Sequence, residues 1–230
     1  MTKHTVRSFD DDLDEIGRLI HAMGSLAADM VAQSTGPLTQ ADRVAVAEIR
    51  REDRRMDDMQ REVDNLAVTT IALRQPMAQD LRIIVSAIRT AGEYERIGDL
   101  AKNISRRLEA VGSFPAMRHF AGGLDRMSQL TCDQAKAIVA LYAARSPDRL
   151  DALRDRDEAV DTAYLAVFGE VLAFMKENPA DTAECTHLLF CAKNLERIGD
   201  HVTNIAEHAY YMETGEELSA KRPKRNEFMP

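Results

Sequence analysis

The sequence Glu95-Arg96-Ile97-Gly98-Asp99 recurs without change as Glu196-Arg197-Ile198-Gly199-Asp200 in a chain of 230 residues. An asparagine followed by isoleucine comes after each copy at the same spacing, at Asn103 and Asn204. Self-similarity of this kind in so short a chain indicates a duplicated structural unit. We therefore expect two similar halves, each built around one copy of the motif.

Each copy places two acids and an amide at positions i, i+4 and i+8, which share one face of a helix. Two carboxylates placed in this way repel each other by a few tenths of a kcal/mol. In both copies the acids interrupt an otherwise apolar helix face, which predicts a compensating cation. Gly98 and Gly199 each cost a helix about 1 kcal/mol relative to alanine, so we expect a neighbouring helix or a ligand to approach closely there.

The composition favours helices and a chain that does not bind nucleic acid. Apolar residues make up 45% of the chain, aromatic residues only 5%, and there is no tryptophan. The net charge of −8 argues against general affinity for nucleic acid. The three cysteines form no Cys-x-x-Cys pair, and no hydrophobic signal or membrane-length segment is evident. These features predict a cytoplasmic protein with reduced, buried thiols.

Prolines separate six segments that have helical periodicity, because proline is poorly tolerated inside a helix. Short joints make successive helices antiparallel neighbours, so we predict an all-α fold of two tandem, internally symmetric three-helix bundles. The helices are expected at about 8–34, 39–74, 77–111, 117–144, 148–177 and 180–213. The predicted units are a first bundle at 1–112, a second at 113–216 and a basic, flexible tail at 217–230.

A second pair of acids at i, i+4 lies on the middle helix of each half, at corresponding heights. In each half the two acid pairs then face each other across antiparallel helices. Such all-oxygen ligand sets suit hard or borderline divalent cations or iron. The alternative to metal binding is that these acids lie on a solvated face and pair with arginines. The predicted metal-ligating residues are Asp53, Asp57, Glu95, Asp99 and Asn103 in the first half, and Asp157, Asp161, Glu196, Asp200 and Asn204 in the second.

The arrangement resembles the PhoU family over nearly the whole chain. The resemblance is carried by the duplicated motif and by Ser8-Phe9, Arg74-Gln75-Pro76, Asp80-Leu81-Arg82 and Asn194-Leu195. The second half departs from this pattern, because it has Glu177-Asn178-Pro179 and no Asp-Leu-Arg follows. The resemblance implies paired three-helix bundles with metal clusters on the acid motifs. Iron or zinc is the first expectation for the metal, with manganese or magnesium as alternatives.

The same resemblance implies a regulatory role in bacterial phosphate uptake. A PhoU-like protein is expected to act as a negative regulator of phosphate-starvation signalling. It would link the phosphate ABC transporter, through its ATPase subunit PstB, to the sensor histidine kinase PhoR. A homodimer is expected, located in the cytoplasm and peripheral to the inner membrane only through these partners.

Two alternatives of other classes remain open at this point. A di-metal carboxylate enzyme would use Glu-x-x-His motifs, and one such motif is present, at Glu184 and His187. That architecture needs two copies, and the chain has no glycine-rich phosphate loop or nucleophile elbow. We therefore expect the protein not to be an enzyme. The other alternative is a purely structural helical scaffold with solvated acids.

Overall fold

A computed structural model describes residues 3–35, 43–112, 115–144 and 150–217. Over these ranges the chain contains helices and no strands, which confirms the all-α prediction. None of the described helices is both long enough and apolar enough to cross a membrane. The helices are α1 (Lys3–Thr35), α2 (Arg43–Arg74), α3 (Gln79–Val111), α4 (Met117–Ala144), α5 (Leu150–Glu177) and α6 (Thr182–Thr214), with a 3₁₀ turn η2 (Pro179–Asp181) before α6.

The described helix boundaries lie close to those predicted, and the largest difference is at the start of the first helix. α1 begins at Lys3, earlier than expected, and the starts predicted at 39 and 148 lie outside the described residues. α3 begins at Gln79 because the chain leaves the helical region around Pro76: Gln75 and Ala78 have φ angles of 51° and 49°. The predicted basic tail lies outside the described residues, apart from its first position.

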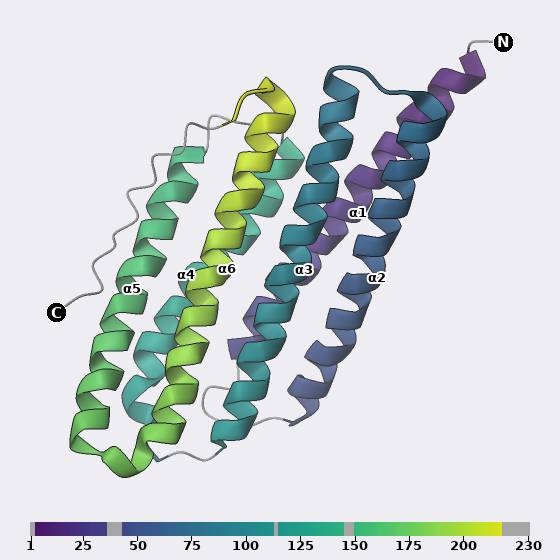
Figure 1. Ribbon diagram of the computed structural model, residues 1–230. Coiled ribbons are helices and arrows are strands. Elements are labelled where there is room, and N and C mark those ends of the chain that lie inside the picture. The colour runs from purple at the N-terminus through teal and green to yellow at the C-terminus, as the bar shows by residue number, and fades with distance from the viewer. Residues whose placement is uncertain (1–2, 36–42, 113–114, 145–149, 218–230) are drawn as a thin grey trace.

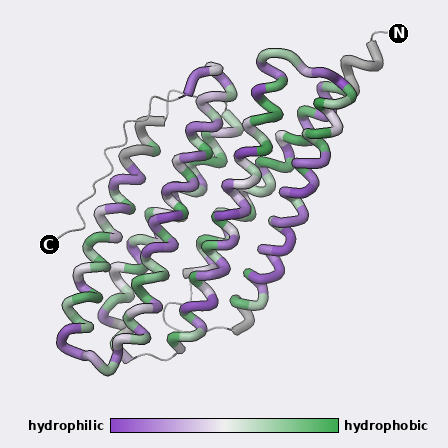
Figure 2. The backbone as a smooth tube through the Cα atoms, viewed as in Figure 1, coloured by the Kyte–Doolittle hydropathy of each residue, from purple (hydrophilic) through white to green (hydrophobic). Residues whose placement is uncertain are grey.

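The two three-helix bundles lie side by side and share one core (Figure 1). The most extensive helix contact joins α3 of the first half to α6 of the second, and α1 also packs against α4. α2 packs on α1 and α3, while α5 packs on α4 and α6, so these two helices form the outer edges. Hydrophilic residues predominate along much of α2, as expected for a helix with one buried face (Figure 2).

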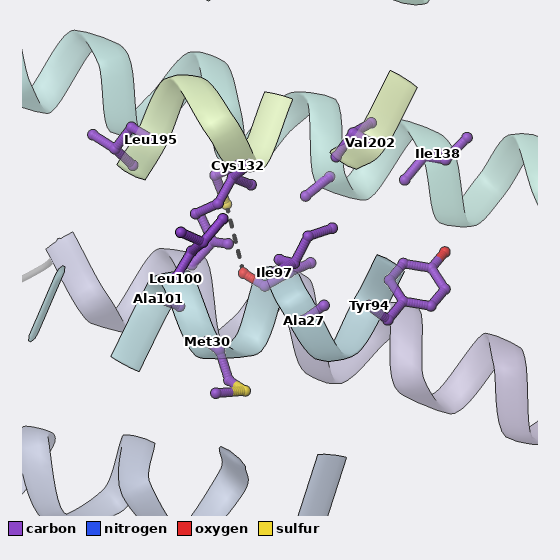
Figure 3. Close-up of a cluster of buried hydrophobic side chains, with 14 of the residues drawn as sticks. Ala27, Met30, Tyr94, Ile97, Leu100, Ala101, Cys132, Ile138, Leu195 and Val202 are labelled. Atoms are coloured by element: carbon purple, nitrogen blue, oxygen red, sulfur yellow. Dashed lines mark hydrogen bonds between the residues drawn. The ribbon is translucent and has the colours of Figure 1, made fainter. Parts of the chain in front are cut away.

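Apolar side chains from both halves meet between the inner helices. Figure 3 shows Ile97 and Leu100 of α3 in one cluster with Leu195 and Val202 of α6, together with side chains of α1 and α4. The thiol of Cys132 points to the carbonyl oxygen of Ala28 at 3.9 Å. All three cysteines are free and buried, as predicted. Burial raises the pKa of one of them, Cys191, to about 12, which keeps that thiol protonated.

Close packing between the halves makes Gly24 of α1 sensitive to substitution. A Cβ atom at Gly24 would lie 2.7 Å from Tyr94 Oη and 2.8 Å from Val139 Cγ2, whereas one at Gly17 would meet nothing within 4 Å. We expect Gly24→Ala to lower the free energy of unfolding by about 1–3 kcal/mol through overpacking. Gly17→Ala should raise it by up to about 1 kcal/mol through helix propensity. Urea unfolding measures both, and equal effects would contradict this packing.

Candidate functional site

The structure brings the eight predicted acids together as two groups of four. The first cluster consists of Asp53 and Asp57 on α2 with Glu95 and Asp99 on α3, and the second of Asp157 and Asp161 on α5 with Glu196 and Asp200 on α6. Within each cluster the carboxylates are close enough to perturb one another's ionisation. Acid pairs at i, i+4 on adjacent antiparallel helices produce this arrangement, since each pair occupies one helix face.

A lysine that the sequence analysis did not single out lies in the first cluster. The ammonium group of Lys102 donates hydrogen bonds to Asp53 Oδ2 at 2.7 Å and to Asp99 Oδ1 at 2.5 Å. Partial burial lowers the pKa of Lys102, but these two hydrogen bonds outweigh that effect and the pKa is raised. Lys102 lies one turn after Asp99 on α3, which was the available signal.

The remaining two carboxylates of the first cluster show the cost of crowding. Burial, followed by the charge of Asp53, raises the pKa of Asp57, although Lys102 opposes this shift. Burial and the charges of Asp99, Asp57 and Asp53 raise the pKa of Glu95. These groups therefore hold their protons more tightly than ordinary carboxylates do, which is expected where negative charge is incompletely neutralised.

The second cluster has a buried amide beside it and a lysine at its rim. Gln134 of α4 is wholly buried, and its Nε2 donates to Asp157 Oδ1 at 3.2 Å. The amide oxygen of Gln134 has no hydrogen-bond partner within the described part of the chain. Lys193 lies 2.6 Å from Glu196 Oε2, with 44% of its side chain exposed. Burial, and then the charges of the other three carboxylates, raise the pKa of Asp161 to about 6.

The two predicted asparagine ligands lie one turn beyond the motifs, and one of them has another partner. Asn204 Nδ2 donates to Glu93 Oε2 at 3.0 Å, and His201 Nδ1 lies 2.7 Å from the same oxygen. This contact joins α6 to α3 across the two halves, so the amide of Asn204 is engaged away from the second cluster. Asn103 is partly buried on α3.

The two motif glycines have different surroundings in the two halves. A Cβ atom at Gly199 would lie 3.0 Å from Asp157 Oδ1 and 3.1 Å from Gln134 Oε1. The expected close approach thus occurs at Gly199, where the side chains of Asp157 and Gln134 lie close to α6. At Gly98 the nearest group is Met30, at 3.5 Å, which is ordinary van der Waals contact.

The clusters suit a metal ion by the chemistry of their donors. Carboxylate and amide oxygens are ligands of hard or borderline divalent cations. In the described residues, no three histidine, cysteine, aspartate or glutamate side chains are already grouped to hold a metal ion together. Metal binding would therefore need side-chain rotations, and it stays a prediction. The unpaired amide oxygen of Gln134 is the donor that such an ion would satisfy.

Comparison with known proteins shows strong similarity along almost the entire chain. A family model described as the PhoU domain matches residues 20–108 and 124–209. The phosphate-specific transport system accessory protein PhoU homolog of Rhizobium meliloti (strain 1021) is 45% identical over 221 residues, which cover 96% of this chain and 93% of that protein. The protein of the same name from Caulobacter vibrioides (strain NA1000 / CB15N) is 40% identical over 224 residues, 97% of each chain.

Two solved structures have the same fold. The crystal structure of PhoU from Pseudomonas aeruginosa has a TM-score of 0.77 and 30% identity, and the match covers 90% of this chain and 100% of that one. The phosphate transport system regulatory protein PhoU from Streptococcus pneumoniae has a TM-score of 0.83 and 22% identity, covering 92% and 100%. The second likeness concerns the fold alone, and both agree with two helical bundles.

The raised pKa of Asp161 predicts how acid affects stability when no metal is bound. A folded-state pKa of about 6, above the ordinary 3.8, means that ionised Asp161 destabilises the fold above about pH 6 and does so no longer below about pH 4. Asp161→Asn should therefore raise the free energy of unfolding at pH 7.5 by up to about 1 kcal/mol, allowing for solvent screening.

This advantage should shrink as the pH falls toward 4. Urea unfolding in the presence of a chelator at several pH values measures it. Glu158→Gln, at an exposed position on the same helix, is the matched control and should change little. An advantage of Asp161→Asn that grows toward acid would contradict the assignment.

Proposed function

This chain belongs to the PhoU family, and from that premise we propose that it is an accessory regulator of phosphate-specific transport. The observation that carries the proposal is the 45% identity, across nearly the full length, to a protein named for that role. In finer detail, we propose that it restrains phosphate-starvation signalling when phosphate is plentiful. It would do so by linking a PstB-like ATPase subunit of the transporter to a PhoR-like sensor kinase.

The fold supports action by docking. The described helices pack on one shared core, and the outer helices α2 and α5 offer faces at opposite edges. A partner's conformation can be shifted only if the regulator binds one of its states more tightly than the other. We propose that the protein acts as a homodimer in the cytoplasm, reaching the inner membrane only through its partners.

We also propose that the carboxylate clusters bind a divalent or trivalent metal ion, with iron or zinc first and manganese or magnesium as alternatives. Asp53, Asp57, Glu95 and Asp99 would hold it in one half, and the corresponding acids of α5 and α6 in the other. A bound ion would supply positive charge and join an outer helix to an inner one. The carboxylates themselves would orient it between those helices.

The enzyme alternative has less support. A di-metal carboxylate centre would require a second Glu-x-x-His motif besides that of Glu184 and His187, and the sequence has one. His187 lies on α6 more than two turns before Glu196, which is the first acid of the second cluster on that helix. We therefore propose that the metal serves structure or docking and that the protein carries out no catalysis.

Deletion of the gene tests the regulatory proposal. In cells grown with abundant phosphate, loss of the protein should switch on a phosphate-starvation reporter such as alkaline phosphatase, and the wild-type chain should restore repression. The measurement is reporter activity at high and low phosphate. A reporter that stays repressed at high phosphate after deletion would contradict a negative regulatory role.

Metal content tests the clusters. The double variant Asp99→Ala/Asp200→Ala should lose bound metal and remain helical, because each substitution removes one carboxylate ligand and alanine favours the helix. Elemental analysis of protein purified without a chelator or a histidine tag gives the metal content, and circular dichroism reports the fold.

Asp58→Ala/Glu158→Ala is the matched control, since these exposed acids adjoin the clusters on α2 and α5 without belonging to them. The control should retain its metal. Equal metal content in the wild type and in Asp99→Ala/Asp200→Ala would show that Asp99 and Asp200 are not metal ligands.

A further inference from the structure

The two clusters differ at the positions that determine whether the protein itself supplies a cation to neutralise the carboxylates. Lys102 and Thr203 both stand third after the last residue of their motifs, so they correspond in the duplication. Met30 and Gln134 also correspond, because each is the α1 or α4 side chain that contacts the motif glycine of its own half. The first half thus has a lysine and a methionine where the second has a threonine and a glutamine.

The first cluster contains its own cation. Lys102 places its ammonium group between Asp53 and Asp99, the one residue from α2 and the other from α3. Only 23% of this lysine side chain is exposed, so its charge is well placed to neutralise both acids. The facing core residue Met30 is wholly buried and offers a thioether, which is a poor ligand for a hard cation.

The second cluster has no equivalent of that ammonium group at Thr203. The hydroxyl of Thr203 donates to the carbonyl oxygen of Gly199 at 3.2 Å, on its own helix. Lys193 pairs with Glu196 from a partly exposed position at the rim. Asp157 and Asp200 each take part in a further interaction, so the difference between the halves rests on Lys102 and Gln134 and not on these two acids.

Gln134 provides an independent sign that the second cluster is built for a ligand. It is wholly buried, its amide nitrogen donates to Asp157, and its amide oxygen has no hydrogen-bond partner among the residues described. A Cβ atom at Gly199 would lie 3.1 Å from that oxygen, so any larger residue would crowd it. A buried polar oxygen without a partner is unfavourable, and a cation bound to it would remove the penalty.

We infer that the duplicated sites have diverged: Lys102 replaces a metal ion in the first cluster, and the second cluster alone takes up a divalent cation, with the amide oxygen of Gln134 as an additional donor. This inference rests on the proposed metal binding of the clusters and assigns it to one half. It makes Lys102 a built-in counter-ion, which keeps the first bundle independent of metal supply. The second bundle becomes the half that responds to metal.

Exchange of the corresponding residues tests the inference directly. The probe is Mn²⁺, titrated into tag-free, chelator-treated protein, with free Mn²⁺ counted by electron paramagnetic resonance. In an otherwise wild-type chain, Asp200→Ala should abolish tight binding and Asp99→Ala should leave it intact. Lys102→Thr should add a second class of sites, which a further Asp99→Ala removes.

Two reciprocal changes should weaken the site of the second half. Thr203→Lys, which imports the counter-ion, and Gln134→Met, which imports the first half's core residue, should each weaken Mn²⁺ binding by roughly tenfold or more. Thr203→Val is the matched control and should bind like the wild type. Circular dichroism checks that each variant folds, and the two single aspartate variants decide the question even where Thr203→Lys does not fold.

The outcomes separate the inference from the proposed function. Equal loss of Mn²⁺ in Asp99→Ala and in Asp200→Ala, or no new site in Lys102→Thr, would overturn the divergence of the two clusters while metal binding itself stands. Absence of Mn²⁺ binding in the wild type and in every variant would overturn both the inference and the proposed metal binding. Loss confined to Asp200→Ala, with a gain in Lys102→Thr, is the result that supports the inference.

Discussion

Repulsion between carboxylates held on neighbouring helices is the constraint on which the functional part of this structure depends. Two carboxylates one turn apart on an exposed helix face repel by a few tenths of a kcal/mol, and partial burial strengthens the repulsion. Each half holds four carboxylates where an outer helix meets an inner one, and burial together with their mutual repulsion raises the pKa values of Asp57, Glu95 and Asp161. A cation lowers this repulsion: Lys102 supplies one in the first half, and we propose a metal ion in the second.

The rest of the fold holds the clusters in place. α3 and α6 each carry one motif and pack against one another along the centre of the molecule, so one shared core joins the helices of the two acidic clusters. Glu93, His201 and Asn204 add a polar contact to that interface. Burial raises the pKa of Glu93, but hydrogen bonds from His201 and Asn204 outweigh this, and its pKa is lowered.

Much of this architecture could be predicted from the sequence, because its signals are local. Prolines and apolar seams predicted six helices, and the spacing of the acids on antiparallel neighbours predicted both clusters. The sequence could not distinguish halves that lie side by side from halves stacked end to end, because both arrangements would bury the same apolar seams. Lys102 and Gln134 were missed for different reasons. Lys102 resembled any solvated lysine, and Gln134 stands in a seam position where an apolar residue is expected.

A closer comparison of the halves would have revealed both residues, since Lys102 corresponds to Thr203 and Met30 corresponds to Gln134 in the duplication.

The most direct test of the divergence between the two clusters is a crystal structure of the protein grown with Mn²⁺, with anomalous scattering used to locate the metal. We expect an anomalous peak among Asp157, Asp161, Glu196 and Asp200, with Lys102 still bonded to Asp53 and Asp99. A peak in the first cluster with Lys102 displaced, or no peak in either cluster, would contradict it.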